Sequence, residues 1–125
     1  MVRGIGTDII GVDRIKTILC GDHRESFIQR VFTENEIRYC ESKYRPEMHY
    51  AARFAAKEAF FKALGTGYRD GMSWKDISVK NDELGKPVIE LSGKTLGNFK
   101  NKKFHHVHLS ISHTKDYAVS FVVID

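Results

Sequence analysis

The end of the chain carries the clearest strand pattern. Apolar and polar residues alternate over 105–112, which predicts a strand with one buried face. The apolar positions of that strand are Val107, Leu109 and Ile111. Residues 117–124 are apolar on both faces, so the last strand should be covered on both sides. Either the protein's own long helix or a neighbouring subunit would supply the second cover.

The first half of the chain predicts one strand followed by helices. The expected elements are a strand over 2–10 and helices over 13–19, over 24–31, over a short segment after residue 33, and over 46–64. Asp13 would cap the first helix, and Thr33 with Glu36 forms a capping box. Pro46 suits the first turn of the long helix, and Gly65 suits its end.

A hairpin and a further helix should connect the long helix to the last strands. The expected ranges are strands over 74–79 and 87–91 around a polar segment, then a helix over 92–100 capped by Ser92. These patterns indicate the α+β class, with an antiparallel sheet packed on one long helix and several short helices. We expect a single domain over residues 1–125.

Composition adds few restrictions. The 125 residues are 42% hydrophobic and 29% charged, which is ordinary for a globular protein. No stretch approaches the ~20 apolar residues of a membrane helix. No apolar run with a cleavage site opens the chain, so we expect a cytoplasmic protein without membrane contact. Cys20 and Cys40 are far apart, and we read them as idle thiols in a reduced compartment.

The net charge of +4 favours an acidic protein partner or a phosphate-rich ligand, although solubility alone explains it equally well. A small basic nucleic-acid-binding domain without catalysis is one alternative. Its basic residues would form a stripe, and this chain shows neither a stripe nor a nucleic-acid motif, so we expect no nucleic-acid partner. An inert scaffold is another alternative, and it leaves Asp8 and the charged block over 57–62 unexplained.

The long helix carries the first candidate chemistry. Glu58 and Lys62 are four residues apart and therefore share a face. A surface salt bridge worth only ~0.3–0.5 kcal/mol would explain that spacing. The small apolar residues around the pair indicate that the helix is closely packed, and Phe54 on the same stripe suggests that the stripe is partly enclosed.

Asp8 lies late in the first strand, among Ile and Gly residues. A buried carboxylate needs a hydrogen-bond partner, a lysine or a metal ion. If Asp8 and Glu58 converge, their charges repel unless a cation lies between them. Mg²⁺ suits two carboxylates and completes its shell with water and substrate phosphates. Lys62 would then lie one turn away from Glu58, within reach of a phosphate oxygen.

The combination of these segments resembles the phosphopantetheinyl transferases. The motifs are Gly6-Thr7-Asp8, then Phe54-x-x-Lys57-Glu58-x-x-x-Lys62-Ala63, about fifty residues later. Further segments resemble the short holo-acyl-carrier-protein synthase branch: Arg30-Val31-Phe32-Thr33 with Glu36, Trp74-x-Asp76-Ile77, Gly85-Lys86-Pro87 and Ser110-Ile111-Ser112-His113. The resemblance covers essentially the whole chain. Gly11 departs from it, because the family often has an acidic residue there.

The resemblance implies a reaction, a cofactor and an assembly. The phosphopantetheine arm of coenzyme A would move to a serine of an acyl carrier protein, and 3′,5′-ADP would leave. Asp8 and Glu58 would hold Mg²⁺, while Lys62 would stabilise the phosphoryl oxygens as a second catalytic residue beside Glu58. The serine proton would pass to Glu58 or to water. The family is similar in forming trimers with active sites between subunits.

The resemblance also suggests residues for coenzyme A and the carrier protein. Candidates for coenzyme A, besides Lys62, are Arg53 and His105 at the 3′-phosphate, Lys86, and Gly65 through close backbone approach. Gly65 is otherwise only a helix cap, and both Arg53 and His105 could be simply solvated. Arg14 and Arg24 would dock an acidic carrier protein. A zinc site at His106 and His108 is a weaker alternative, because no third ligand has matching spacing.

Overall fold

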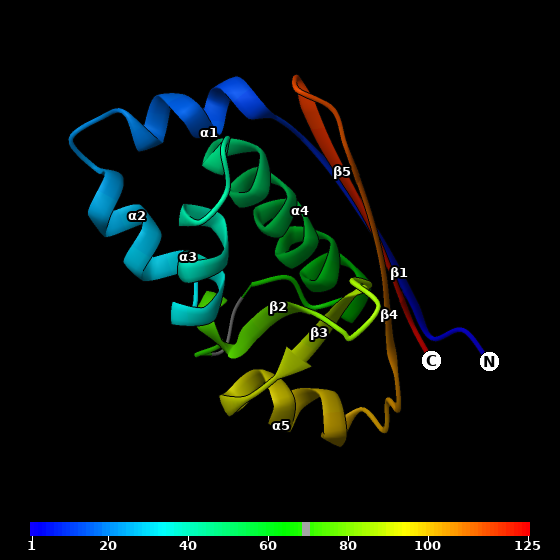
Figure 1. Ribbon diagram of the computed structural model, residues 1–125. Helices are drawn as coiled ribbons and strands as arrows, with labels where there is room; N and C mark the ends of the chain where they lie inside the picture. Colours follow the sequence, from blue (N-terminus) through cyan, green and yellow to red (C-terminus); the bar gives the residue numbers. More distant parts are fainter. Residues whose placement is uncertain (69–70) are drawn as a thin grey trace.

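Helix α4 (Pro46–Leu64) lies along one face of a three-stranded antiparallel sheet (Figure 1). The computed structural model describes residues 1–68 and 71–125. The sheet has the order β1-β5-β4 and consists of β1 (Gly4–Gly11), β4 (Val107–His113) and β5 (Tyr117–Ile124). The predicted bounds of α4 and its end at Gly65 are confirmed. Gly65 has φ of 87°, a left-handed conformation that favours glycine.

Glycines in β1 let the strand rest directly on α4. A Cβ atom at Gly4 would meet the main-chain carbonyl of Ala63, and one at Gly6 would meet that of Ala59. Successive side chains of a strand point to opposite faces, so Asp8 shares the face of these glycines. The close approach of the two backbones therefore places Asp8 against the helix.

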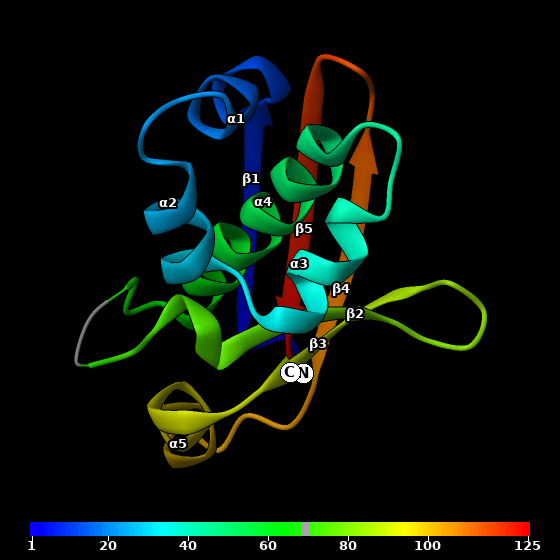
Figure 2. The same cartoon turned by 60° about the vertical axis from the view of Figure 1, so that its left-hand side comes forward.

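Three short helices cover the side of α4 that faces away from the sheet (Figure 2). They are α1 (Val12–Leu19), α2 (Arg24–Val31) and α3 (Glu34–Glu41). The bounds of α2 and the Thr33–Glu36 capping box are as predicted. The cap expected at Asp13 is wrong: Asp13 lies inside the first turn of α1, and Gly11 occupies the cap position.

The hairpin forms a second sheet, which corrects the expectation of one sheet. It consists of β2 (Ile77–Asn81) and β3 (Pro87–Leu91), followed by α5 (Gly93–Asn101). The strand expected over 74–79 begins only at Ile77, because Trp74–Asp76 forms the 3-10 helix η1. Ser92 is the cap residue of α5, but its side chain makes no capping hydrogen bond.

The outer face of the three-stranded sheet is apolar and exposed. On β5, Ala118, Val122 and Ile124 are buried against the molecule's interior, so α4 covers only one of the two apolar faces. The exposed apolar residues of this sheet are Ile5, Ile9, Tyr117, Val119 and Phe121. We call these five residues the outer sheet face. Among the described helices, none is long and apolar enough to span a membrane.

Candidate active site

Asp8 and Lys62 meet where β1 crosses α4. The Lys62 Nζ atom donates to the Asp8 Oδ1 atom over 3.1 Å and to the Thr7 carbonyl oxygen over 3.0 Å. The Asp8 side chain is 17% exposed and the Lys62 side chain 55% exposed, so the pair opens to solvent on the lysine side. Lys62 thus bridges helix and strand instead of forming a salt bridge with Glu58 along the helix.

Glu58 lies one turn before Lys62 on the same stripe of α4. The pKa of Glu58 is raised, first because burial disfavours the charged carboxylate and second because of the negative charge of Asp8. The positive charges of Lys62 and Arg14 act in the opposite direction. The structure therefore brings Asp8, Glu58 and Lys62 together, with Arg14 close by.

The two carboxylates suit a hard divalent cation. A cation between Asp8 and Glu58 would offset the repulsion that contributes to the raised pKa of Glu58. Mg²⁺ commonly binds through one or two carboxylates and takes its remaining oxygen ligands from water and phosphates. Within residues 1–68 and 71–125, no group of three or more His, Cys, Asp or Glu side chains is arranged to hold a metal ion. At this site the described residues thus contribute two carboxylates, those of Asp8 and Glu58.

The histidines considered for zinc have another partner. The His106 Nδ1 atom lies 2.7 Å from one carboxylate oxygen of Asp125, and the His108 Nε2 atom lies 3.0 Å from the other. These hydrogen bonds lower the pKa of Asp125, the bond with His108 contributing most. His108 on β4 and His106 just before it therefore bind Asp125, the residue that follows β5.

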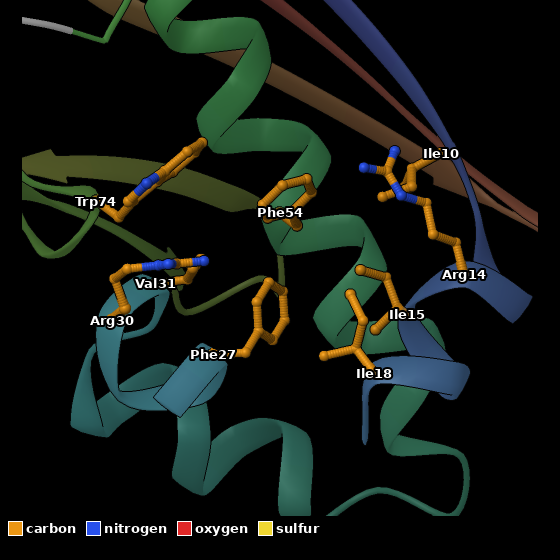
Figure 3. Close-up of a pocket in the computed structure, with 9 residues that line it drawn as sticks. All are labelled: Ile10, Arg14, Ile15, Ile18, Phe27, Arg30, Val31, Phe54 and Trp74. Carbon is orange, nitrogen blue, oxygen red and sulfur yellow. The ribbon is translucent and has the colours of Figure 1, made fainter. Parts of the chain in front are cut away.

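A cavity of about 220 Å³ lies beside the charged cluster, between α1, α2 and α4 (Figure 3). Arg14 both lines this cavity and acts on the charge of Glu58, so the two sites adjoin. Apolar side chains form most of the walls, and Arg14 and Arg30 supply positive charge. We call this space the α1–α2 pocket; its lining residues are Ile10, Arg14, Ile15, Ile18, Phe27, Arg30, Val31, Phe54 and Trp74.

Arg53 lies on a different face of α4 from Glu58. The two residues are five positions apart, which is about 140° around the helix axis. Arg53 is 5% exposed, donates to the Asn81 Oδ1 atom over 3.0 Å and stacks over the Tyr39 ring at 4.0 Å. Its Nε atom is buried and has no hydrogen-bond partner among the described residues. A buried charged donor without a partner is costly, so it suits an incoming anion.

A second cavity of about 240 Å³ has Arg53 in its wall. The hairpin residues Gly85 and Pro87, which flank Lys86, also line it, as does His113 at the end of β4. His105 precedes the other end of β4, where its main-chain N–H donates to the Asp125 carbonyl oxygen over 2.7 Å. Arg53 and His105 of one chain are thus separated by the length of β4. They could hold the same phosphate only if different subunits supplied them.

The two arginines predicted to dock the carrier protein differ in their surroundings. Arg14 projects from α1 towards Ile10 at the α1–α2 pocket (Figure 3). Arg24 is already paired: its Nη2 atom donates to the Glu41 Oε2 atom over 2.9 Å, and the Tyr50 hydroxyl donates to the same oxygen over 2.7 Å. Arg14 is therefore the freer of the two to meet an external carboxylate.

Sequence reasoning missed the most deeply buried charges in this region. Lys57 and Glu36 have 0% exposed side chains and form an ion pair of 2.7 Å. The capping box already explained why a glutamate stands at position 36. Nothing in the sequence indicated that Glu36 also has a long-range partner. Lys57 belongs to the recognised motif, but the motif does not distinguish a buried lysine from a phosphate-binding one.

Comparisons with known proteins show which proteins this chain resembles in sequence and in fold. A family model described as the 4′-phosphopantetheinyl transferase superfamily matches residues 4–122. A holo-[acyl-carrier-protein] synthase from Syntrophus aciditrophicus is 44% identical over 125 residues, covering 100% of this chain and 97% of the relative. The crystal structure of the Neisseria meningitidis synthase has a TM-score of 0.89 at 35% identity, covering 100% of this chain and 99% of the other. The Bacillus anthracis synthase in complex with CoA (3′,5′-ADP) has a TM-score of 0.80 at 42% identity, covering 99% and 96%.

Proposed function

Because the chain belongs to the 4′-phosphopantetheinyl transferase superfamily, we propose that it transfers 4′-phosphopantetheine from coenzyme A to a serine of an apo-acyl carrier protein. The products are a holo-acyl carrier protein and 3′,5′-ADP. The observation that carries the proposal is the convergence of Asp8, Glu58 and Lys62 at the junction of β1 and α4. We place the activity in the cytoplasm, in support of fatty acid biosynthesis.

Asp8 and Glu58 are the residues that would hold Mg²⁺. The bound ion would supply positive charge beside the pyrophosphate of coenzyme A. Lys62 lies next to this position, and its half-exposed ammonium group can donate to a phosphoryl oxygen. Charge that develops on the phosphoryl group and on the leaving 3′,5′-ADP is stabilised by such a fixed donor.

The serine oxygen attacks the phosphorus atom attached to pantetheine, and the bond to the 3′,5′-ADP oxygen breaks. The serine proton passes to Glu58 or to a water molecule beside it. Glu58 suits proton transfer because its carboxylate lies beside the reacting groups; without the ion, burial and the charge of Asp8 raise its pKa. The positive charges of Lys62 and Arg14 limit this rise in the pKa.

The nucleotide end of coenzyme A requires cationic donors at some distance from Glu58. We assign the 3′-phosphate to Arg53 and His105, assisted by Lys86, with Gly65 near the path of the ligand. Support comes from the unpaired Nε atom of Arg53 and from the cavity that it shares with the hairpin. Because Arg53 and Glu58 occupy different faces of α4, neighbouring subunits would complete each site.

A homotrimer fits the outer sheet face. Phe121, Ile9 and Tyr117 are 45%, 66% and 58% exposed and lie on neighbouring strands. A contiguous apolar surface of this kind marks a protein–protein contact. Association through this face would cover the second side of β5, which the sequence pattern had predicted to be covered.

The acyl carrier protein would dock over α1 and α2. Arg14 and Arg24 supply positive charge, and the α1–α2 pocket offers an apolar recess next to Glu58. A partner whose acidic surface surrounds an apolar side chain matches both features. The recess would then hold the carrier close to the reacting serine.

The direct test is to incubate the protein with an apo-acyl carrier protein, coenzyme A and Mg²⁺, and to measure the intact mass of the carrier. A mass gain equal to phosphopantetheine is expected. A carrier with its acceptor serine replaced by alanine, and the enzyme variant Asp8→Ala, should show no gain. An unmodified carrier, when a second known transferase modifies the same preparation, would overturn the proposal.

A further inference from the structure

The ammonium group of Lys57 is fully engaged inside the protein. Its Nζ atom donates to the Val31 carbonyl oxygen over 2.6 Å, to the Glu36 Oε1 atom over 2.7 Å and to the Trp74 carbonyl oxygen over 3.1 Å. An ammonium group has three donors, and these three acceptors use all of them. With a side chain that is 0% exposed, Lys57 cannot reach coenzyme A or the carrier protein.

Glu36 is satisfied just as completely. Its Oε1 atom also accepts from the main-chain N–H of Thr33 over 2.8 Å, and its Oε2 atom accepts from the main-chain N–H of Val79 over 2.8 Å. The Lys57–Glu36 pair therefore joins the end of α2, the start of α3, η1, β2 and the middle of α4. Burial lowers the pKa of Lys57, and the charge of Glu36 opposes that shift.

The two main-chain carbonyls held by Lys57 belong to walls of the α1–α2 pocket. Val31 lines the pocket from α2, and Trp74 lines it from η1, where its ring stacks on that of Phe54 at 5.4 Å (Figure 3). Lys57 itself immediately precedes Glu58 on α4. One buried group thus fixes two pocket walls relative to the helix that carries the catalytic carboxylate.

We propose that the Lys57–Glu36 ion pair is a positioning device that sets the shape of the α1–α2 pocket and thereby the affinity for the carrier protein. The proposal rests on the proposed function, because that function places the carrier over this pocket. The two lysines of the motif over 57–62 then have different roles: Lys57 positions the pocket walls, and Lys62 faces the phosphates. Loss of the pair would loosen Val31 and Trp74 while leaving the Asp8–Lys62 contact in place.

The test uses Lys57→Met combined with Glu36→Gln, so that no unpaired charge remains buried. The matched control is Lys80→Met combined with Glu90→Gln, which removes an exposed ion pair of 3.0 Å on the β2–β3 hairpin by the same substitutions. Glu36→Gln alone is the second variant: its side-chain carbonyl can still accept from Lys57, but the buried ammonium group loses its counter-ion, so a larger loss of stability is expected than in the double variant. Trp74 is the only tryptophan, so its fluorescence reports on the pocket wall.

In the Lys57/Glu36 double variant, the KM for the carrier should rise between about tenfold and a hundredfold, as expected for a misplaced binding surface. The Kd for coenzyme A should stay within about twofold. The Trp74 emission should shift to longer wavelength, and acrylamide should quench it more, at temperatures far below the melting temperature. The control variant should match the wild type in all three measurements.

A lowered melting temperature with unchanged Trp74 emission and unchanged carrier KM would reduce the pair to a purely structural role and overturn the proposal. Failure of both Glu36 variants to fold would do the same. If the wild type transfers nothing to the carrier, the proposed function fails. The Trp74 emission would still decide whether the ion pair sets the pocket wall.

Discussion

At the scale of single residues, the site combines groups that destabilise one another in the free protein. Glu58 is pushed towards its neutral form by burial and by Asp8, so its pKa lies above the usual value. An acid whose pKa is raised on folding weakens the folded state once it ionises, because the charged form is better solvated in the unfolded chain. The electrostatic strain at the carboxylate pair is therefore released by a bound cation or by protonation.

Glu58→Gln should raise the melting temperature of the metal-free protein at pH 7 and abolish transfer. The stabilisation should shrink as the pH falls through the folded-state pKa of Glu58, because the wild-type carboxyl is then neutral as well. Melting curves between about pH 4, which is near the ordinary pKa of a carboxyl group, and about pH 8 would measure how the stabilisation changes. Equal melting temperatures for the wild type and Glu58→Gln at every pH, or full activity of the variant, would contradict the role of the carboxylate pair Asp8 and Glu58.

Lys62→Ala should lower kcat at saturating coenzyme A by about 100- to 1,000-fold, because it removes a fixed donor from the developing phosphoryl charge. The exposed lysine Lys100 provides the matched control, since Lys100→Ala removes the same charge from a different helix, α5. Steady-state kinetics with both variants would compare them. An unchanged kcat for Lys62→Ala would show that its contact with Asp8 serves only the fold.

Sequence patterns predicted Asp8, Glu58 and Lys62 because the residue types and their order are distinctive. The same patterns could not show that Lys57 reaches Glu36, which is 21 residues away, or that Arg53 binds Asn81 and lines a cavity beside the hairpin. Those contacts depend on how α3, η1 and the hairpin pack around α4. Long-range packing of this kind leaves no local periodicity to read.

At the scale of elements, the contact of β1 with α4 determines where the carboxylates meet. Helix bounds were predictable where a cap residue, a proline or a glycine marked them, as at Thr33, Pro46 and Gly65. The 3-10 helix at Trp74–Asp76 also had a local sign that was overlooked: Ser73 and Asp76 form a capping box. The separation into two sheets had no such sign, because strand pairing is decided by tertiary packing.

Gly6→Ala should destabilise the protein by about 1–3 kcal/mol, because the new Cβ atom would meet the carbonyl of Ala59 and push β1 from α4. Transfer activity should fall as well, since Asp8 lies two residues further along the same face of β1. Gly97→Ala on α5 is the control: its Cβ atom would meet nothing within 4 Å, so a small stabilisation is expected. Urea unfolding of both variants distinguishes close packing from a general effect of removing glycine.

At the scale of the whole molecule, the chain presents two surfaces that its own elements leave uncovered. The outer sheet face is apolar, whereas the surface around α1 and the α1–α2 pocket combines apolar walls with arginines. The first suits identical subunits, which associate permanently, and the second suits an acidic partner that must leave after each transfer. In the proposed function, subunit contacts and carrier contacts would therefore lie on different elements.

Phe121→Glu should dissociate the proposed trimer, because it places a charge in the middle of the outer sheet face. Light scattering should give three times the 14.3 kDa chain mass for the wild type and the mass of a single chain for the variant. Transfer should be lost together with the trimer, since Arg53 and Glu58 of one chain lie on different faces of α4. The control is Leu84→Glu, at a hairpin residue that is 95% exposed. A monomeric wild type, or a monomeric but fully active variant, would contradict subunit-shared sites.

Docking of the carrier protein should depend on Arg14 and on ionic strength. Arg14→Glu should raise the KM for the carrier because a charge at the rim of an interface acts mainly on the rate of encounter, and salt screens that action. Wild-type transfer should slow as salt is added, and the variant should respond less. Lys100→Glu reverses the sign of an exposed charge on α5 and serves as the control.

Arg14 also contributes to the electrostatics of Glu58, so a change in docking must be separated from a change in chemistry. At saturating carrier the two differ: a docking residue changes KM and leaves kcat nearly intact, whereas an effect through Glu58 lowers kcat. We expect the first pattern at low salt, together with an unchanged Kd for coenzyme A. A fall in kcat without a change in carrier KM would move the docking surface away from α1 and leave Arg14 with a role at the carboxylate pair.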